Sequence, residues 1–136
     1  TNWDPEDRWE GLDELFPYID VFMPNDEEAL RISHKADLEQ AGEFFLERGV
    51  KMITIKEGKR GARVVTAEGI IRQSVEPVSG GDSIGAGDSF DAGFLAGWLR
   101  GEPLERCLQI GSACGRSVAS KIGGLAGQLT AAQVGL

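Results

Sequence analysis

The chain has 136 residues, of which 41% are hydrophobic and 26% are charged, and its formal net charge is −8. This length fits a single domain, and the composition is that of an ordinary globular chain. The acidic balance argues against nucleic acid and against an anionic membrane surface as partners.

The predicted elements alternate between helices and strands along the chain. Apolar residues at helical spacing or an N-cap residue predict helices over 6–16, from Asn25 onward, and over 36–48, 87–100 and 104–121. Apolar runs rich in β-branched residues predict strands ending at 1–2 and covering 19–23, 51–55, 62–66 and 70–75. Helices placed between strands predict an α/β fold with a mainly parallel sheet.

The two cysteines, Cys107 and Cys114, lie seven residues apart on the last predicted helix. A rise of 1.5 Å per residue separates their Cα atoms by about 10 Å, whereas a disulfide needs less than about 7 Å. We therefore expect two free thiols. Because the sequence also has no signal peptide and no bilayer-spanning apolar run, it favours a cytoplasmic protein without a membrane partner.

The segment Asp82–Phe90 (DSIGAGDSF) carries the strongest functional signal, because it joins a glycine-rich loop to an apolar helix. Gly85 and Gly87 let the backbone come close to a ligand. The helix that follows presents unpaired N–H groups and a positive dipole end, which favour phosphate. Asp88 adds a carboxylate that a simple anion site does not need. A base beside a phosphate cradle indicates phosphoryl transfer to a hydroxyl.

The wider segment Asp82–Gly93 resembles the D-T-x-G-A-G-D-x-F-x-x-G signature of the ribokinase-like (PfkB) carbohydrate kinases, with Ser83 in place of the usual Thr. The resemblance implies a three-layer ribokinase-like fold and a kinase that uses ATP and Mg²⁺. It also implies that Asp88 is the catalytic base. The anion hole would then be formed by Gly85, Ala86 and Gly87.

A second segment, Pro24–Ala29, resembles the P-N-x-x-E-A motif of the same family. The resemblance implies that Asn25 and Glu28 bind ATP and hold Mg²⁺ through water. From the residues alone, an ordinary N-cap followed by an acidic first turn is the favoured interpretation, since such caps are common.

A third segment, Lys56–Ala62, resembles a strand and turn that lie beside the nucleotide's phosphates and ribose in the family. The resemblance implies ATP contacts from Lys56, Gly58 and Gly61. A plain hairpin turn is the alternative interpretation of the same residues.

A fourth segment, Gly111–Cys114, resembles a helix that carries a small polar residue near the adenine, which implies that Ser112 binds ATP. Close helix packing explains these small residues equally well. The resemblance further implies a monovalent cation site, for example for K⁺, at Asp82 and the carbonyl of Ile84, with Gly124 as a weaker candidate.

The resemblance covers nearly all 136 residues but only the C-terminal, nucleotide-binding and catalytic portion of a single ribokinase-like domain. The N-terminal strands, the di-glycine sugar-binding motif and the lid sheet of the family are missing, so we expect a piece of a longer protein. A homodimer of the full-length protein is a further expectation, because the lid often pairs subunits in this family.

The sequence therefore predicts an ATP-dependent kinase that phosphorylates an alcohol of a sugar or a related small molecule. Three alternatives stay open: a nucleotide-binding fragment without catalytic activity, a nucleoside kinase, and a dinucleotide-binding protein. The last is disfavoured because segment 85–90 lacks the third glycine of the G-x-G-x-x-G motif.

Overall fold

A computed structural model describes residues 9–76, 78, 81 and 83–136. The predicted strand end at 1–2 and the predicted cation ligand Asp82 lie outside these residues. The chain divides into two compact units, which are described one at a time. The first contains the residues up to Glu57 together with Val64–Ile70, and the second contains Gly58–Arg63 and Ile71–Leu136. No helix in the described part of the chain is long and apolar enough to cross a membrane.

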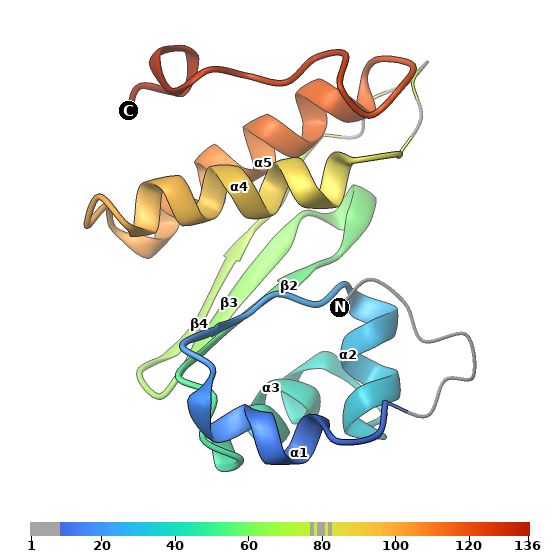
Figure 1. The fold of residues 1–136 in the computed structure, drawn as a ribbon, viewed down its shortest axis with the longest axis vertical. Coiled ribbons are helices and arrows are strands. Elements are labelled where there is room, and N and C mark those ends of the chain that lie inside the picture. The colour runs from blue at the N-terminus through green and yellow to red at the C-terminus, as the bar shows by residue number, and fades with distance from the viewer. Residues whose placement is uncertain (1–8, 77, 79–80, 82) are drawn as a thin grey trace. The chain divides into compact units, whose positions relative to one another are not determined.

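The strands of the described residues form one sheet with the order β1-β2-β3-β4 (Figure 1). They are β1 (Val21–Phe22), β2 (Met52–Lys56), β3 (Ala62–Thr66) and β4 (Gly69–Gln73). β1 and β2 run parallel. The connections 57–61 and 67–68 are too short for a crossover, so the other two pairs are antiparallel and the sheet is mixed.

Two helices, α2 (Asp26–Ser33) and α3 (Leu38–Glu47), connect the parallel strands of the first unit. Each begins at a side-chain cap, since Asn25 Oδ1 accepts the N–H of Glu28 and Asp37 Oδ1 accepts those of Glu39 and Gln40. Such caps satisfy N–H groups that have no partner within the helix. The predicted helix starts at Asn25 and near Ala36 are thus confirmed to within two residues.

The core of the first unit is built around aromatic rings. Phe16 and Phe45 are buried, and Phe22 and Phe44 pack against them edge to face with centroid distances between 4.9 and 6.4 Å. Aliphatic side chains from α2, α3, β2 and β3 complete this core: Ala29, Ile32, Ala41, Ile53, Ile55 and Val65. This core fixes β1 and β2 side by side, and with them the ends of these strands.

The helix predicted over 6–16 is wrong for the described residues, because α1 spans only Leu12–Leu15. Gly11 precedes it with a φ of +82°, a left-handed conformation that cannot continue a helix backwards. A 3-10 turn at Phe16–Tyr18, with Pro17 in its first turn, follows α1. The periodic apolar residues in this stretch therefore pack as a turn and not as a long helix.

The second unit contains two helices that lie side by side, α4 (Ala86–Trp98) and α5 (Leu104–Ala119) (Figure 1). Four glycines form the seam between them. A Cβ at Gly93 would lie 2.8 Å from Cys114 Sγ, and one at Gly97 would lie 3.2 Å from Ile110 Cδ1. From the other side, a Cβ at Gly111 or Gly115 would lie 3.0 Å from a backbone carbonyl oxygen of α4. The helices therefore approach more closely than larger residues would allow.

The two cysteines are free and buried, as predicted. Burial raises the pKa of both thiols, and for Cys107 the carboxylate of Glu102 adds to this effect. Less of each thiol is then ionised at a given pH, and the thiolate is the reactive form. At pH 8 we expect the folded chain to react with a disulfide reagent such as DTNB more than about tenfold more slowly than the chain in guanidinium chloride. Equal rates would show that the seam between α4 and α5 is open.

Candidate functional site

Three predicted site residues of the first unit meet at the carboxyl ends of β1 and β2. Asn25 follows β1 and forms an isolated parallel bridge with Lys56, the last residue of β2. The N–H of Lys56 donates to the Pro24 carbonyl oxygen at 3.0 Å. Glu28 lies one helical turn beyond Asn25. In open α/β sheets, ligands bind beside this edge of the parallel strands.

Asn25 and Glu28 form a reciprocal capping box at this edge. Asn25 Oδ1 accepts the N–H of Glu28 at 2.8 Å, and Glu28 Oε2 accepts the N–H of Asn25 at 2.8 Å. The N-cap interpretation of the sequence is therefore confirmed. It does not exclude the metal role, because the box holds the carboxylate in place and leaves Glu28 Oε1 without a hydrogen-bond partner among the described residues.

The donor set at this edge suits Mg²⁺ bound through water better than direct ligation. Within the described residues, no three carboxylate, histidine or cysteine side chains lie close enough to hold a metal ion together. Mg²⁺ usually keeps several waters and takes only one or two protein carboxylates. Glu28, a half-buried residue with one carboxylate oxygen that has no described hydrogen-bond partner, fits that pattern.

The second cluster of predicted residues lies at the start of α4. The N–H of Ala86 donates to the Ser83 carbonyl oxygen at 3.2 Å, and that of Ser89 donates to Gly85 at 3.0 Å. The N–H groups of Gly87 and Asp88 have no acceptor among the described residues. These two amides, together with the exposed carboxylate of Asp88, are the groups that α4 offers to a ligand.

The left-handed glycine of this loop is Gly85, with a φ of +74°, whereas Gly87 is helical. A Cβ at Gly85 would lie 3.0 Å from the carbonyl oxygen of Gly124. A Cβ at Gly124 would in turn lie 3.3 Å from the Ile84 carbonyl oxygen. The structure thus brings Ile84 and Gly124 together, whereas Asp82 lies outside the described residues, so the cation site stays a prediction.

Gly58 and Gly61, the predicted nucleotide contacts of the turn, differ in their surroundings. Both have positive φ, at +56° and +107°, in and just after a 3-10 turn over Gly58–Arg60. Nothing lies within 4 Å of a Cβ built at Gly58. A Cβ at Gly61 would collide with the carbonyl group of Gln73 in β4. The hairpin therefore already requires a glycine at position 61, whereas Gly58 is open to a ligand.

Ser112 on α5 is 9% exposed, and its hydroxyl has no hydrogen-bond partner among the described residues. Arg116 lies one turn further along α5, and its Nε is likewise buried without a described partner. Sequence reasoning did not single out Arg116, because no motif marks it. The sequence signal that could have pointed to Arg116 is its spacing of four residues from Ser112, which places both side chains on the same face of a helix.

Comparison with known proteins identifies the family. The chain matches the pfkB family of carbohydrate kinases over residues 2–131. It belongs to the PfkB family. The cytidine kinase of Thermococcus kodakarensis is 34% identical to this PfkB chain over 120 residues, which are 85% of the chain but 42% of that kinase. The family membership confirms the resemblance carried by Asp82–Gly93 and the ribokinase-like fold class.

Solved structures agree with this PfkB assignment. A structure described as Ribokinase II from E. coli, in complex with ATP and Mg²⁺, has a TM-score of 0.83 and 31% identity, with 90% of this chain and 40% of that chain covered. Ribokinase from Arabidopsis thaliana, complexed with ribose and ATP, has a TM-score of 0.80 and 27% identity, with 90% and 41% covered. The chain thus spans about two fifths of the length of these relatives.

Proposed function

We propose that this chain is the nucleotide-binding and catalytic portion of an ATP-dependent kinase that phosphorylates an alcohol of a small molecule, with a sugar as the favoured acceptor. One observation carries the proposal: α4 begins with two backbone amides, at Gly87 and Asp88, that have no acceptor among the described residues and lie beside the exposed carboxylate of Asp88. Amides suit the phosphoryl group, and the carboxylate suits the proton of the attacking hydroxyl.

In this proposal each group has a separate task. Asp88 accepts the proton of the acceptor hydroxyl while that oxygen attacks the γ-phosphorus of ATP, and ADP leaves. The amides of Gly87 and Asp88 stabilise charge on the transferred group. Mg²⁺, when bound, neutralises charge on the phosphate oxygens. Glu28, whose Oε2 accepts the N–H of Asn25, would hold that ion through water, and Lys56 at the end of β2 would add positive charge.

Ser112 and Gly58 are proposed as further nucleotide contacts. The Ser112 hydroxyl is buried without a described partner, and a ligand would supply one. Gly58 leaves open space for a close backbone approach. At Gly61, the hairpin itself already requires a glycine, because a Cβ there would collide with the Gln73 carbonyl. A K⁺ site at Asp82 and Ile84, a homodimer of the full-length protein and a cytoplasmic location stay predictions.

The relatives suggest two classes of phosphoryl acceptor. One relative is a cytidine kinase, and one neighbour was solved with ribose. A sugar and a nucleoside are therefore both acceptors to test. Full-length protein containing these 136 residues should release ADP from ATP and Mg²⁺ in the presence of one member of a sugar and nucleoside panel. Absence of acceptor-dependent ADP release across the panel would contradict the proposal.

The 136-residue chain by itself should show no such activity. Relatives carry more than half of their length outside the matched region, and positioning of the acceptor supplies much of the rate in phosphoryl transfer. The same panel assay on the purified chain tests this. Robust acceptor-dependent turnover would show that the chain is a complete, minimal kinase.

Gly87→Val in the full-length protein should raise the KM for ATP or abolish activity while the fold largely survives. Gly87 is exposed in the first turn of α4, and a β-branched side chain there would obstruct a phosphate approaching the amides of Gly87 and Asp88, which have no acceptor among the described residues. Steady-state kinetics with a circular-dichroism melt separates the two effects. Normal kinetics would show that the amides at this helix start do not bind phosphate.

A further inference from the structure

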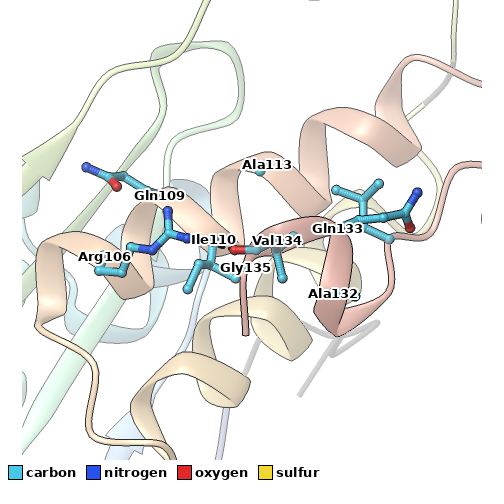
Figure 2. A pocket seen from close by; sticks show the side chains of 9 residues that line it. Arg106, Gln109, Ile110, Ala113, Ala132, Gln133, Val134 and Gly135 are labelled. Atoms are coloured by element: carbon cyan, nitrogen blue, oxygen red, sulfur yellow. Dashed lines mark hydrogen bonds between the residues drawn. The ribbon is translucent and has the colours of Figure 1, made fainter.

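A groove of about 420 Å³ lies between α5 and the 3-10 turn η3 (Ala131–Val134), both within the second unit (Figure 2). None of the residues proposed for the nucleotide site lines it. Ile110, which is 1% exposed, provides an apolar floor, and Ala113 and Val134 extend it. The groove therefore offers apolar surface that the kinase proposal does not use.

Arg106 gives this groove a positive charge in a chain whose net charge is −8. Its Nη2 donates to the Val134 carbonyl oxygen at 2.7 Å, which holds the guanidinium against the turn. No carboxylate of the described residues forms an ion pair with it, and no acidic side chain lines the groove. A guanidinium has five N–H donors in a planar fork that matches carboxylate and phosphate groups. Most of these donors stay available.

The other polar side chains of the groove also have donors to spare. Gln133 Oε1 accepts from both the N–H and the hydroxyl of Thr130, at 2.9 and 3.0 Å, so its amide N–H₂ is the group left over. Gln109 is exposed, and its amide makes no hydrogen bond to a described residue. A fixed cation, two amides and an apolar floor together suit an anion that has an apolar part.

We propose that this groove binds a small organic anion, whose carboxylate or phosphate group pairs with Arg106 and whose apolar part packs against Ile110 and Val134. The binding requires only groups of the second unit. It does not depend on the kinase proposal, and either can fail without the other.

The test is an NMR titration of the ¹⁵N-labelled 136-residue chain. The probes are hexanoate and phenyl phosphate, which combine charge with an apolar part, inorganic phosphate, which has charge only, and hexanol, which is neutral. The two organic anions should move the amide signals of Arg106, Gln109 and Gly135. Hexanol should bind at least about tenfold more weakly, the usual effect of losing one charge-assisted contact, and inorganic phosphate should bind more weakly than phenyl phosphate.

Three variants make the result specific. Gln109→Glu places a negative charge in the groove without removing a hydrogen bond, and it should weaken hexanoate binding by about tenfold or more. Arg106→Ala should abolish binding, although it also frees the C-terminal turn. Arg100→Ala is the matched control, since Arg100 also donates to a backbone carbonyl oxygen, that of Ala96, but lies outside the groove. It should bind hexanoate like the unaltered chain.

Three outcomes would overturn the proposal. Groove signals that do not move with either organic anion would show that no such site exists. Equal binding by Gln109→Glu and the unaltered chain would show that the charge of the groove is irrelevant. Saturating ATP and Mg²⁺ that shift the same signals and block hexanoate would show that the groove is part of the nucleotide site.

Discussion

Replacing Asp88 with asparagine should lower kcat of the full-length kinase by about 10²–10⁴-fold, the usual contribution of a general base. The side chain is exposed at the start of α4, so the change removes a proton acceptor and leaves the fold in place. The amides of Gly87 and Asp88 are backbone groups and remain, so the affinity for ATP should change little. Rates at saturating substrate and calorimetric ATP affinity measure the two quantities separately.

Asp91→Asn is the matched control for this prediction, because it makes the same chemical change one turn further along the same helix. It should retain kcat within about threefold, as expected for a group outside the reaction. If Asp88→Asn keeps full kcat, the carboxylate has no catalytic role. A loss of ATP affinity equal to the loss of kcat would instead indicate that Asp88 shapes the phosphate site.

Gly61→Ala should destabilise the 136-residue chain by about 2–5 kcal/mol, the sum of about 1–2 kcal/mol of backbone strain and about 1–3 kcal/mol of overpacking. The added methyl group would require a left-handed alanine and would collide with the carbonyl of Gln73, so β4 has to move. Urea unfolding followed by circular dichroism measures the change in the free energy of unfolding.

Gly58→Ala is the control within the same turn. Its φ is also positive, but the space around it is open, so only the strain of about 1–2 kcal/mol applies. If the two variants lose similar amounts of unfolding free energy, the contact with Gln73 is not the reason why position 61 requires a glycine. In the full-length kinase, Gly58→Ala should weaken ATP binding more than Gly61→Ala does, since Gly58 is the position open to a nucleotide.

The elements with clear end signals were predictable from the sequence. Asn25 marks a helix start by local chemistry, and its side chain caps α2 as predicted. Gly49 directly follows the helix predicted over 36–48, and its left-handed φ of +94° is typical of a residue just beyond a helix end. The prediction for the first helix was wrong because it relied on the spacing of apolar residues and gave too little weight to Gly11. The left-handed backbone of Gly11 stops the helix from extending toward the N-terminus. The α/β fold class is confirmed. The described strands form a mixed sheet, because connections of two and five residues join β3 to β4 and β2 to β3 as hairpins, and the alternation of helices and strands does not reveal this.

The candidate site divides in the same way. The motif around Asp88 predicted the helix start and its carboxylate, because glycine and acid positions along the chain carry that information directly. The sequence could not show which amides of this helix start already donate a hydrogen bond within the protein. The structure shows that the N–H of Ala86 donates to the Ser83 carbonyl oxygen. Likewise, the Gln73 carbonyl beside Gly61 comes from a strand distant in the chain, and only the folded hairpin reveals it.

The close approach of α4 and α5 has a consequence for anyone who tries to make this protein more heat-resistant. Exchanging a helical glycine for alanine ordinarily stabilises by up to about 1 kcal/mol, and it is a standard first choice in such work. At Gly93 and Gly111 the added methyl group would press on Cys114 or on the Phe90 carbonyl. Overpacking of this kind costs about 1–3 kcal/mol, so the sign reverses. Mutant libraries designed for stability should therefore keep glycine at these positions and vary residues on the exposed face of each helix.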